Sequence, residues 1–139
     1  MLLEVNFIEV SIRSEKKQVI EFLSELHGIM NKDGFNIRKQ FVFIKSSKEE
    51  MMYSTRYALV DLDYDDFDVI DRLRELTVSD YSETLFDKDD DKPPLLFVFG
   101  KTIEGKEVYI KLKIKGEENK KILCVSFHYA KYKMNHPYA

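Results

Sequence analysis

Apolar residues recur at spacings of three and four along two stretches of the first half of the chain, as they do in amphipathic helices. The first stretch, residues 14–34, ends at a glycine of the kind that often follows a helix. The second, residues 63–76, carries carboxylates in its first turns, where the helix dipole favours them. The predicted buried faces are Val19, Ile20, Leu23, Leu26, His27 and Met30 in the first helix, and Phe67, Ile70, Leu73 and Leu76 in the second.

From residue 95 onward, apolar and polar positions alternate, which predicts β-strands. Polar, glycine-containing turns separate three such segments, and this arrangement predicts an antiparallel meander. The predicted strands are residues 95–101, 106–115 and 121–128, and the predicted turns are residues 102–105 and 116–120.

Shorter apolar runs predict three further strands in the first half of the chain, at residues 6–11, 40–45 and 56–63. Residues 77–94 are largely polar and predict an exposed connection. The helices precede the main sheet, and no linker-like composition divides the chain. We therefore expect a single domain of the α+β class over residues 1–139.

Alternation also assigns the residues of the last two strands to the two faces of the sheet. The apolar face, which should pack on the helices, is predicted to hold Val108, Ile110, Leu112, Ile114, Leu123, Val125 and Phe127. The outer face is predicted to hold Glu107, Tyr109, Lys111, Lys113, Lys115, Ile122, Cys124, Ser126 and His128. One register pairs Tyr109 with Ser126 and another pairs it with His128, and in both registers Tyr109 and His128 are cross-strand neighbours.

The composition is that of a globular domain, with 44% hydrophobic residues, 34% charged residues and a net charge of −3. The charge is uneven: residues 61–91 carry thirteen acidic and three basic residues, whereas residues 100–139 carry nine lysines and four glutamates. We attribute part of the acidic cluster to the positive end of the helix dipole rather than to a metal site, because its spacing is not that of a calcium loop. The lysines either solvate strand edges or face a polyanion.

The single cysteine, Cys124, excludes internal disulfides and multi-cysteine zinc sites, and its β-branched neighbours predict a buried thiol rather than a reactive one. No apolar stretch is long enough to span a membrane. The N-terminal stretch has glutamates and no basic leader, unlike a signal peptide. We expect a cytoplasmic protein that uses neither a metal nor another cofactor.

The predicted outer face suits chemistry on a phosphodiester. Lys111, Lys113 and Lys131 supply positive charge for phosphates and their transition states. Tyr109 and His128 can transfer protons. Tyr129, Tyr132 and Tyr138 offer rings on which unpaired RNA bases stack. A solvated sheet face without function is the alternative from pattern alone, and no phosphate-binding glycine loop, serine nucleophile elbow or zinc signature is present.

Two segments carry a family resemblance: LTVSDYSE, and LFVFGKTIEGKEVYIKLKIKGEENKKILCVSFHYAKYKMNHPY. In order and spacing they resemble the MqsR family of type II toxins. The nearest likeness is to its longer members, which share the VFGK-x-I-x-G-x-E-V-Y-I-K run and a C-[IV]-S-F-H-x-A ending followed by P-Y. The resemblance is clearest over residues 69–139.

The resemblance implies a RelE-like fold, with helices on a twisted antiparallel sheet. It also implies an endoribonuclease that cleaves mRNA without a metal through attack of the ribose 2′-hydroxyl. Such toxins are held inactive by a protein antitoxin, and we expect no binding to membranes or, by the toxin alone, to DNA. Tyr109 falls on the tyrosine implicated in catalysis and Lys111 on the adjoining strand lysine, while His128 takes the place of a lysine in shorter members.

Two positions depart from the family pattern. Glu83 stands where the shorter members have a lysine, and Leu96 stands where they have a glutamine. Because a carboxylate repels phosphate, these changes leave open an altered or weaker nuclease. A non-catalytic protein-interaction module, or a degenerate toxin on the same fold, is the alternative function, and an enzyme of another class is a third.

Overall fold

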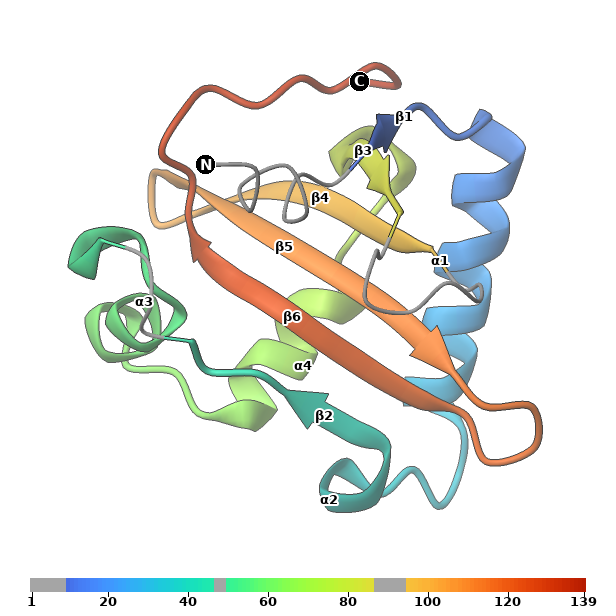
Figure 1. Cartoon of the computed structure of the whole chain (residues 1–139). Helices are drawn as coiled ribbons and strands as arrows, with labels where there is room; N and C mark the ends of the chain where they lie inside the picture. The colour runs from blue at the N-terminus through green and yellow to red at the C-terminus, as the bar shows by residue number, and fades with distance from the viewer. Residues whose placement is uncertain (1–9, 47–49, 87–94) are drawn as a thin grey trace, which may run out of the picture.

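The computed structural model describes residues 10–46, 50–86 and 95–139 and has an α+β fold, as predicted (Figure 1). Helices pack on a mixed sheet of six strands in the order β1-β3-β4-β5-β6-β2. All neighbouring strands are antiparallel except β2 and β6, which are parallel. In the view of Figure 1, α4 crosses behind β5 and β6, and the main core lies between the helices and this face of the sheet.

The helices are α1 (Lys16–Asn31), α2 (Ile37–Gln40), α3 (Thr55–Leu62) and α4 (Asp66–Arg74), with 3₁₀ turns η2 (Met51–Tyr53) and η3 (Val78–Asp80). The strands are β1 (Ser11–Ile12), β2 (Phe41–Phe43), β3 (Tyr81–Leu85), β4 (Leu96–Ile103), β5 (Lys106–Lys115) and β6 (Lys121–Tyr129). In the described part of the chain, no helix combines the length and apolar composition needed to cross a bilayer.

Both predicted helices are present as α1 and α4, and most of their predicted faces are buried. Two positions were assigned wrongly: Ile20 is 49% exposed and Phe67 is 65% exposed. The apolar stripe of α1 instead includes Phe22, whose ring stacks on Phe97 of β4 at 4.2 Å. In α4 the buried stripe keeps Ile70 and Leu73 and includes Val69 in place of Phe67.

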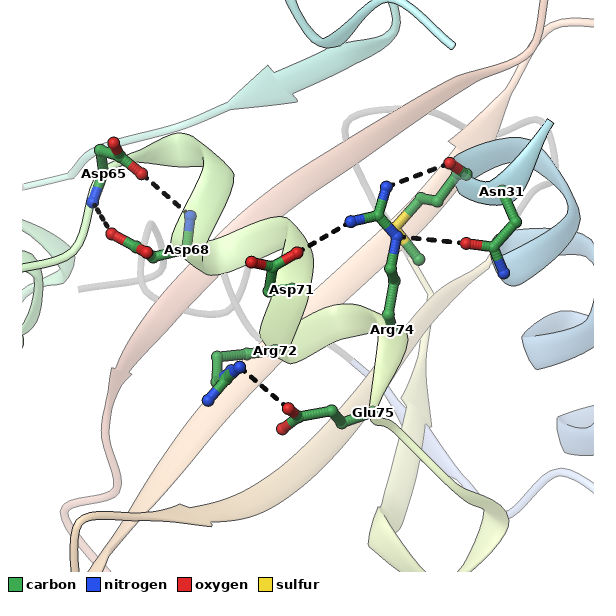
Figure 2. A network of polar contacts seen from close by, with 8 residues as sticks. Asn31, Asp65, Asp68, Asp71, Arg72, Arg74 and Glu75 are labelled. Atoms are coloured by element: carbon green, nitrogen blue, oxygen red, sulfur yellow. Dashed lines mark hydrogen bonds and ion pairs between the residues drawn. The ribbon is translucent and has the colours of Figure 1, made fainter. Parts of the chain in front are cut away.

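Carboxylates of the acidic cluster cap and brace α4, as Figure 2 shows. The Asp68 N–H donates to the Asp65 carboxylate, and the Asp65 N–H donates to the Asp68 carboxylate, both at 2.9 Å. The first of these bonds lowers the pKa of Asp65. Arg74 bonds Asp71 on its own helix and reaches Asn31 and the Met30 carbonyl at the end of α1. Asp66 and Asp68 lie in the first turn of α4, as predicted, and the capping bonds and the Asp71–Arg74 pair are additional structural roles of this cluster.

The predicted C-terminal meander is present as β4, β5 and β6. The turn between β4 and β5 is shorter than predicted and consists of Glu104 and Gly105. Both residues have positive φ, 49° and 80°, as a tight two-residue hairpin requires. The prediction was therefore right in topology but placed the end of β4 two residues too early.

A β-bulge between β5 and β6 corrects the predicted faces of β6. Lys111 pairs with Ser126 and the next residue, Leu112, pairs with Cys124, so Val125 is the extra residue on β6. On the loop side of the bulge, residues 122–124 lie on the face opposite to the predicted one: Ile122 and Cys124 lie in the main core, whereas Leu123 pairs with Lys113 on the outer face. The assignments of Ile122, Leu123, Cys124 and Val125 were wrong, because strict alternation does not allow for an inserted residue.

Cys124 is fully buried, as predicted, and burial raises the pKa of its thiol. On the other side of the bulge, away from the loop, the predicted faces hold, with Ile110 and Phe127 in the core and Tyr109, Lys111, Ser126 and His128 on the outer face. The observed register is the one that pairs Tyr109 with His128.

Residues 56–63, predicted as a strand, form most of α3 instead. Ser54 caps this helix by accepting a hydrogen bond from the Tyr57 N–H at 3.1 Å. Thr55, Ala58 and Leu62 are buried at helical spacing. A short apolar run fits both the helical and the strand periodicity of apolar residues. Here the packing of α3 against β6 favours the helix.

The polar stretch predicted as a connection contains the strand β3. Its residues pair with β4 on one side and with β1 on the other. Polar side chains are tolerated there because they bond one another: Thr84 is 2.6 Å from the Tyr81 hydroxyl and 2.7 Å from that of Ser14. The acidic run at residues 87–92 and most of the strand predicted at residues 6–11 lie outside the described residues.

Candidate functional site: a groove beside Tyr109 and His128

Tyr109 and His128, the two predicted catalytic residues, are direct cross-strand partners on the outer face. Their rings stack with centroids 5.0 Å apart and planes only 9° from parallel. Nδ1 of His128 lies 3.0 Å from the carbonyl oxygen of Tyr129. Because a carbonyl only accepts, Nδ1 carries the proton, and in the neutral ring Nε2 is the acceptor. Nε2 has no hydrogen-bond partner among the described residues.

A groove of about 530 Å³ opens beside this pair and lies within the size range of ligand sites. Three parts of the chain line it. Strands β1 and β3 contribute Ser11, Ser82 and Glu83, together with Arg13 directly after β1, and strands β5 and β6 contribute Tyr109 and His128. The third part is residues 130–139, here called the C-terminal segment, which contributes Lys131, Tyr132, Lys133, Met134, Asn135 and Pro137.

The C-terminal segment is folded back toward β1 rather than frayed (Figure 1). Glu107 accepts hydrogen bonds from the Met134 N–H at 3.2 Å and from Nε2 of His136 at 2.7 Å. The Tyr138 hydroxyl donates to the Ser14 carbonyl at 2.6 Å, and its ring stacks on Tyr81. These anchors fix one wall of the groove against the sheet.

The C-terminal segment lies close against Gly100 of β4, where there is no room for a side chain. A Cβ there would lie 2.8 Å from the sulfur of Met134 and 2.9 Å from Cε1 of His136. A side chain at this position and the anchored segment therefore cannot occupy the same space.

Replacing Gly100 by valine is expected to displace the C-terminal segment. Its two exposed lysines, Lys131 and Lys133, then become more accessible to trypsin, and cleavage after them should be at least severalfold faster under limited proteolysis. Gly28→Ala is the matched control, because a Cβ at Gly28 meets nothing within 4 Å. Equal cleavage rates in both variants would show that the segment does not depend on this contact.

Four of the six predicted site residues line the groove, namely Tyr109, His128, Lys131 and Tyr132. The predicted phosphate ligands Lys111 and Lys113 are not among its lining residues, and Lys113 is only 1% exposed. Lys131 is ion-paired with Glu50, and the hydrogen bond that it donates to the Glu50 carboxylate raises the pKa of its ammonium group. The ammonium group also lies 5.9 Å from the ring centroid of Tyr132, a side chain that is 77% exposed.

The other two tyrosines considered for base stacking have structural positions. Tyr138 packs on Tyr81, and Tyr129 is 7% exposed and donates its hydroxyl proton to Asp61. This bond lowers the pKa of Asp61, and burial together with the carboxylate raises the pKa of Tyr129. Of these three tyrosines, Tyr132 alone is both exposed and among the lining residues of the groove.

Sequence reasoning missed Arg13 and Lys133 as groove residues. Arg13 follows a strand of only two residues, and Lys133 lies in a segment without regular structure, so no periodic pattern marked either one. The two departures from the family pattern have different positions. Glu83 lines the groove and accepts a hydrogen bond from Ser11, whereas Leu96 is buried in a small outer-face cluster with Val98 and Leu85.

Comparison of the chain with protein-family models, with curated proteins and with solved structures found no match. Within residues 10–46, 50–86 and 95–139, no three His, Cys, Asp or Glu side chains are grouped as metal ligands would be. The site is therefore interpreted from its own geometry.

Proposed function

We propose that this chain is a metal-independent endoribonuclease of the toxin type with a RelE-like fold, which cleaves mRNA in the cytoplasm and is inhibited by a cognate antitoxin. One observation carries the proposal: the stacked Tyr109–His128 pair lies in the wall of a groove that also holds Arg13, Lys131 and Lys133. The groove thus combines groups that transfer protons with cations that hold a phosphodiester. The MqsR resemblance implies the same chemistry, with Tyr109 in the catalytic position.

In the proposed reaction, Nε2 of His128 accepts the proton of a ribose 2′-hydroxyl. The 2′-oxygen then forms a bond to the adjacent phosphorus, and the bond from phosphorus to the 5′-oxygen breaks. The departing 5′-oxygen receives a proton, for which Tyr109 is the proposed donor. Cations beside the groove stabilise the additional negative charge of the transition state. The products are a 2′,3′-cyclic phosphate and a 5′-hydroxyl.

The direct test is cleavage of a mixed single-stranded RNA in the presence of EDTA. Wild-type protein is expected to cleave it and to leave 2′,3′-cyclic phosphate ends, whereas the double variant His128→Ala, Tyr109→Phe does not. The two proteins are purified in parallel, so that a contaminating nuclease cleaves in both samples. Equal cleavage by both would contradict the proposal.

A non-catalytic protein-binding module is the second candidate, and one observation favours it. Strand β2 is at the edge of the sheet, and its neighbourhood exposes Val42 by 44% and Ile44 by 43%. An extended segment of a partner protein can pair with such an edge. Expression in bacteria separates the candidates. A nuclease toxin is expected to arrest growth, and His128→Ala is expected to relieve the arrest. A binding module is expected to leave growth unchanged, with or without the substitution.

A further inference from the structure

The groove holds three cations, Arg13, Lys131 and Lys133, against one carboxylate, that of Glu83. It is therefore locally positive in a chain whose net charge is −3. Lys131 is already ion-paired with Glu50, and Glu83 already accepts a hydrogen bond from Ser11. Arg13 and Lys133 differ from Lys131: both are exposed, and neither has an ion pair or side-chain hydrogen bond among the described residues.

These two cations come from segments far apart in the sequence, one directly after β1 and one in the C-terminal segment. The fold brings them to the same groove because Tyr138 and His136 anchor the C-terminal segment near Ser14 and Asp80. A guanidinium presents a planar fork of donors that matches two phosphate oxygens, and an ammonium group acts as a compact point charge. Two unpaired cations of these kinds beside one groove suit an anionic chain with repeating phosphates.

We propose that Arg13 and Lys133 bind the backbone phosphates on either side of the reacting phosphodiester of a single-stranded RNA. The inference rests on the proposed function for the identity of the substrate, and it names the residues that bind and position it. Tyr132 is placed at the same groove, where its exposed ring can stack on a base. A groove of about 530 Å³ admits a short single strand, whereas recognition of double-stranded RNA needs a surface that spans successive grooves of the duplex.

The experiment measures binding without cleavage. The probe is a fluorescent single-stranded RNA in which every ribose carries a 2′-O-methyl group, so that no 2′-hydroxyl can attack. Fluorescence anisotropy gives its affinity over a range of salt concentrations. The test variant is Arg13→Ala, Lys133→Ala, and the matched control is Arg38→Ala, Lys39→Ala. Arg38 and Lys39 are exposed residues of α2, beside the opposite edge strand, and their removal changes the net charge equally.

The test variant is expected to bind the probe about tenfold or more weakly than wild type, because charged hydrogen bonds to phosphate are lost. Its plot of log affinity against log salt should be shallower by about 1.4, which corresponds to two phosphate contacts on a single strand. The control should keep wild-type affinity and slope. Equal losses in both variants, or no loss in either, would overturn the proposal, as would a duplex probe that binds as tightly as the single strand.

Cleavage of unmodified RNA by the same proteins separates this inference from the proposed function. If wild type binds the probe through Arg13 and Lys133 but cleaves nothing, the phosphate contacts stand and the nuclease proposal fails. If wild type cleaves and the test variant binds and cleaves equally well, the nuclease proposal stands and this inference fails. Thermal unfolding of the test variant should match wild type, because both replaced side chains are exposed.

Discussion

Replacing His128 by alanine is expected to lower the rate of RNA cleavage by about 10²–10⁴-fold, which is the usual contribution of a positioned general base. The hydrogen bond from Nδ1 to the Tyr129 carbonyl fixes the tautomer, and the stacked Tyr109 ring fixes the plane of the imidazole. Nε2 is thereby left as a proton acceptor at the groove. Alanine removes the acceptor, and no other described histidine lines the groove to replace it.

The measurement is single-turnover cleavage with enzyme in excess, so that the rate reports the chemical step rather than product release. His27→Ala is the matched control, because His27 lies on α1 with Nε2 3.2 Å from the Leu73 carbonyl and away from the groove. The control should retain the wild-type rate at temperatures where it stays folded. A His128→Ala variant that is folded and cleaves at the wild-type rate would remove His128 from the mechanism.

The second large effect concerns the β-bulge in β6. Ile122→Ala is expected to lower the free energy of unfolding by about 2–5 kcal/mol, since truncating a fully buried aliphatic residue leaves a cavity. Leu123→Ala removes a side chain that is only partly buried and should cost about half as much or less. Urea unfolding of both variants and of the wild type measures the two losses in the free energy of unfolding under the same conditions.

The comparison distinguishes the observed register from the strict alternation that the sequence suggests. Without the bulge, Leu123 would face the core and Ile122 the outer face, so that the order of the two costs would be reversed. The variants lose side chains of similar size from adjacent positions of the same strand, which makes each the control for the other. A larger loss for Leu123→Ala would contradict the bulge.

Much of the local structure could be predicted because it depends on nearby residues. The stripe of Val19, Leu23, Leu26 and Met30 defines α1, and alternation in residues 106–115 defines β5. Alternation in the last two strands placed Tyr109 and His128 as neighbours, but their direct pairing depends on the bulge. The register next to the loop, where Lys115 pairs with Lys121, would place Tyr109 opposite Phe127, and the inserted Val125 shifts the pairing by one residue to His128. The predictions for α3 and β3 were wrong, because the α3 run is short and ambiguous and β3 is rich in polar residues. Their structure depends on packing against β6, β1 and β4.

The sequence by itself determined the α+β class, the C-terminal meander, the buried Cys124 and the placement of Tyr109 and His128 as cross-strand neighbours, with two registers left open. The tertiary structure decided which cations join that pair. Arg13 and Lys133 meet at the groove, whereas Lys113 is buried on the outer face. The reason is physical: hydrophobic periodicity specifies which side of a strand a residue occupies, but not which distant segment covers that side. Here the contacts of the C-terminal segment with Glu107, Ser14 and Gly100 determine which segment covers that side, and these contacts join residues far apart in the chain.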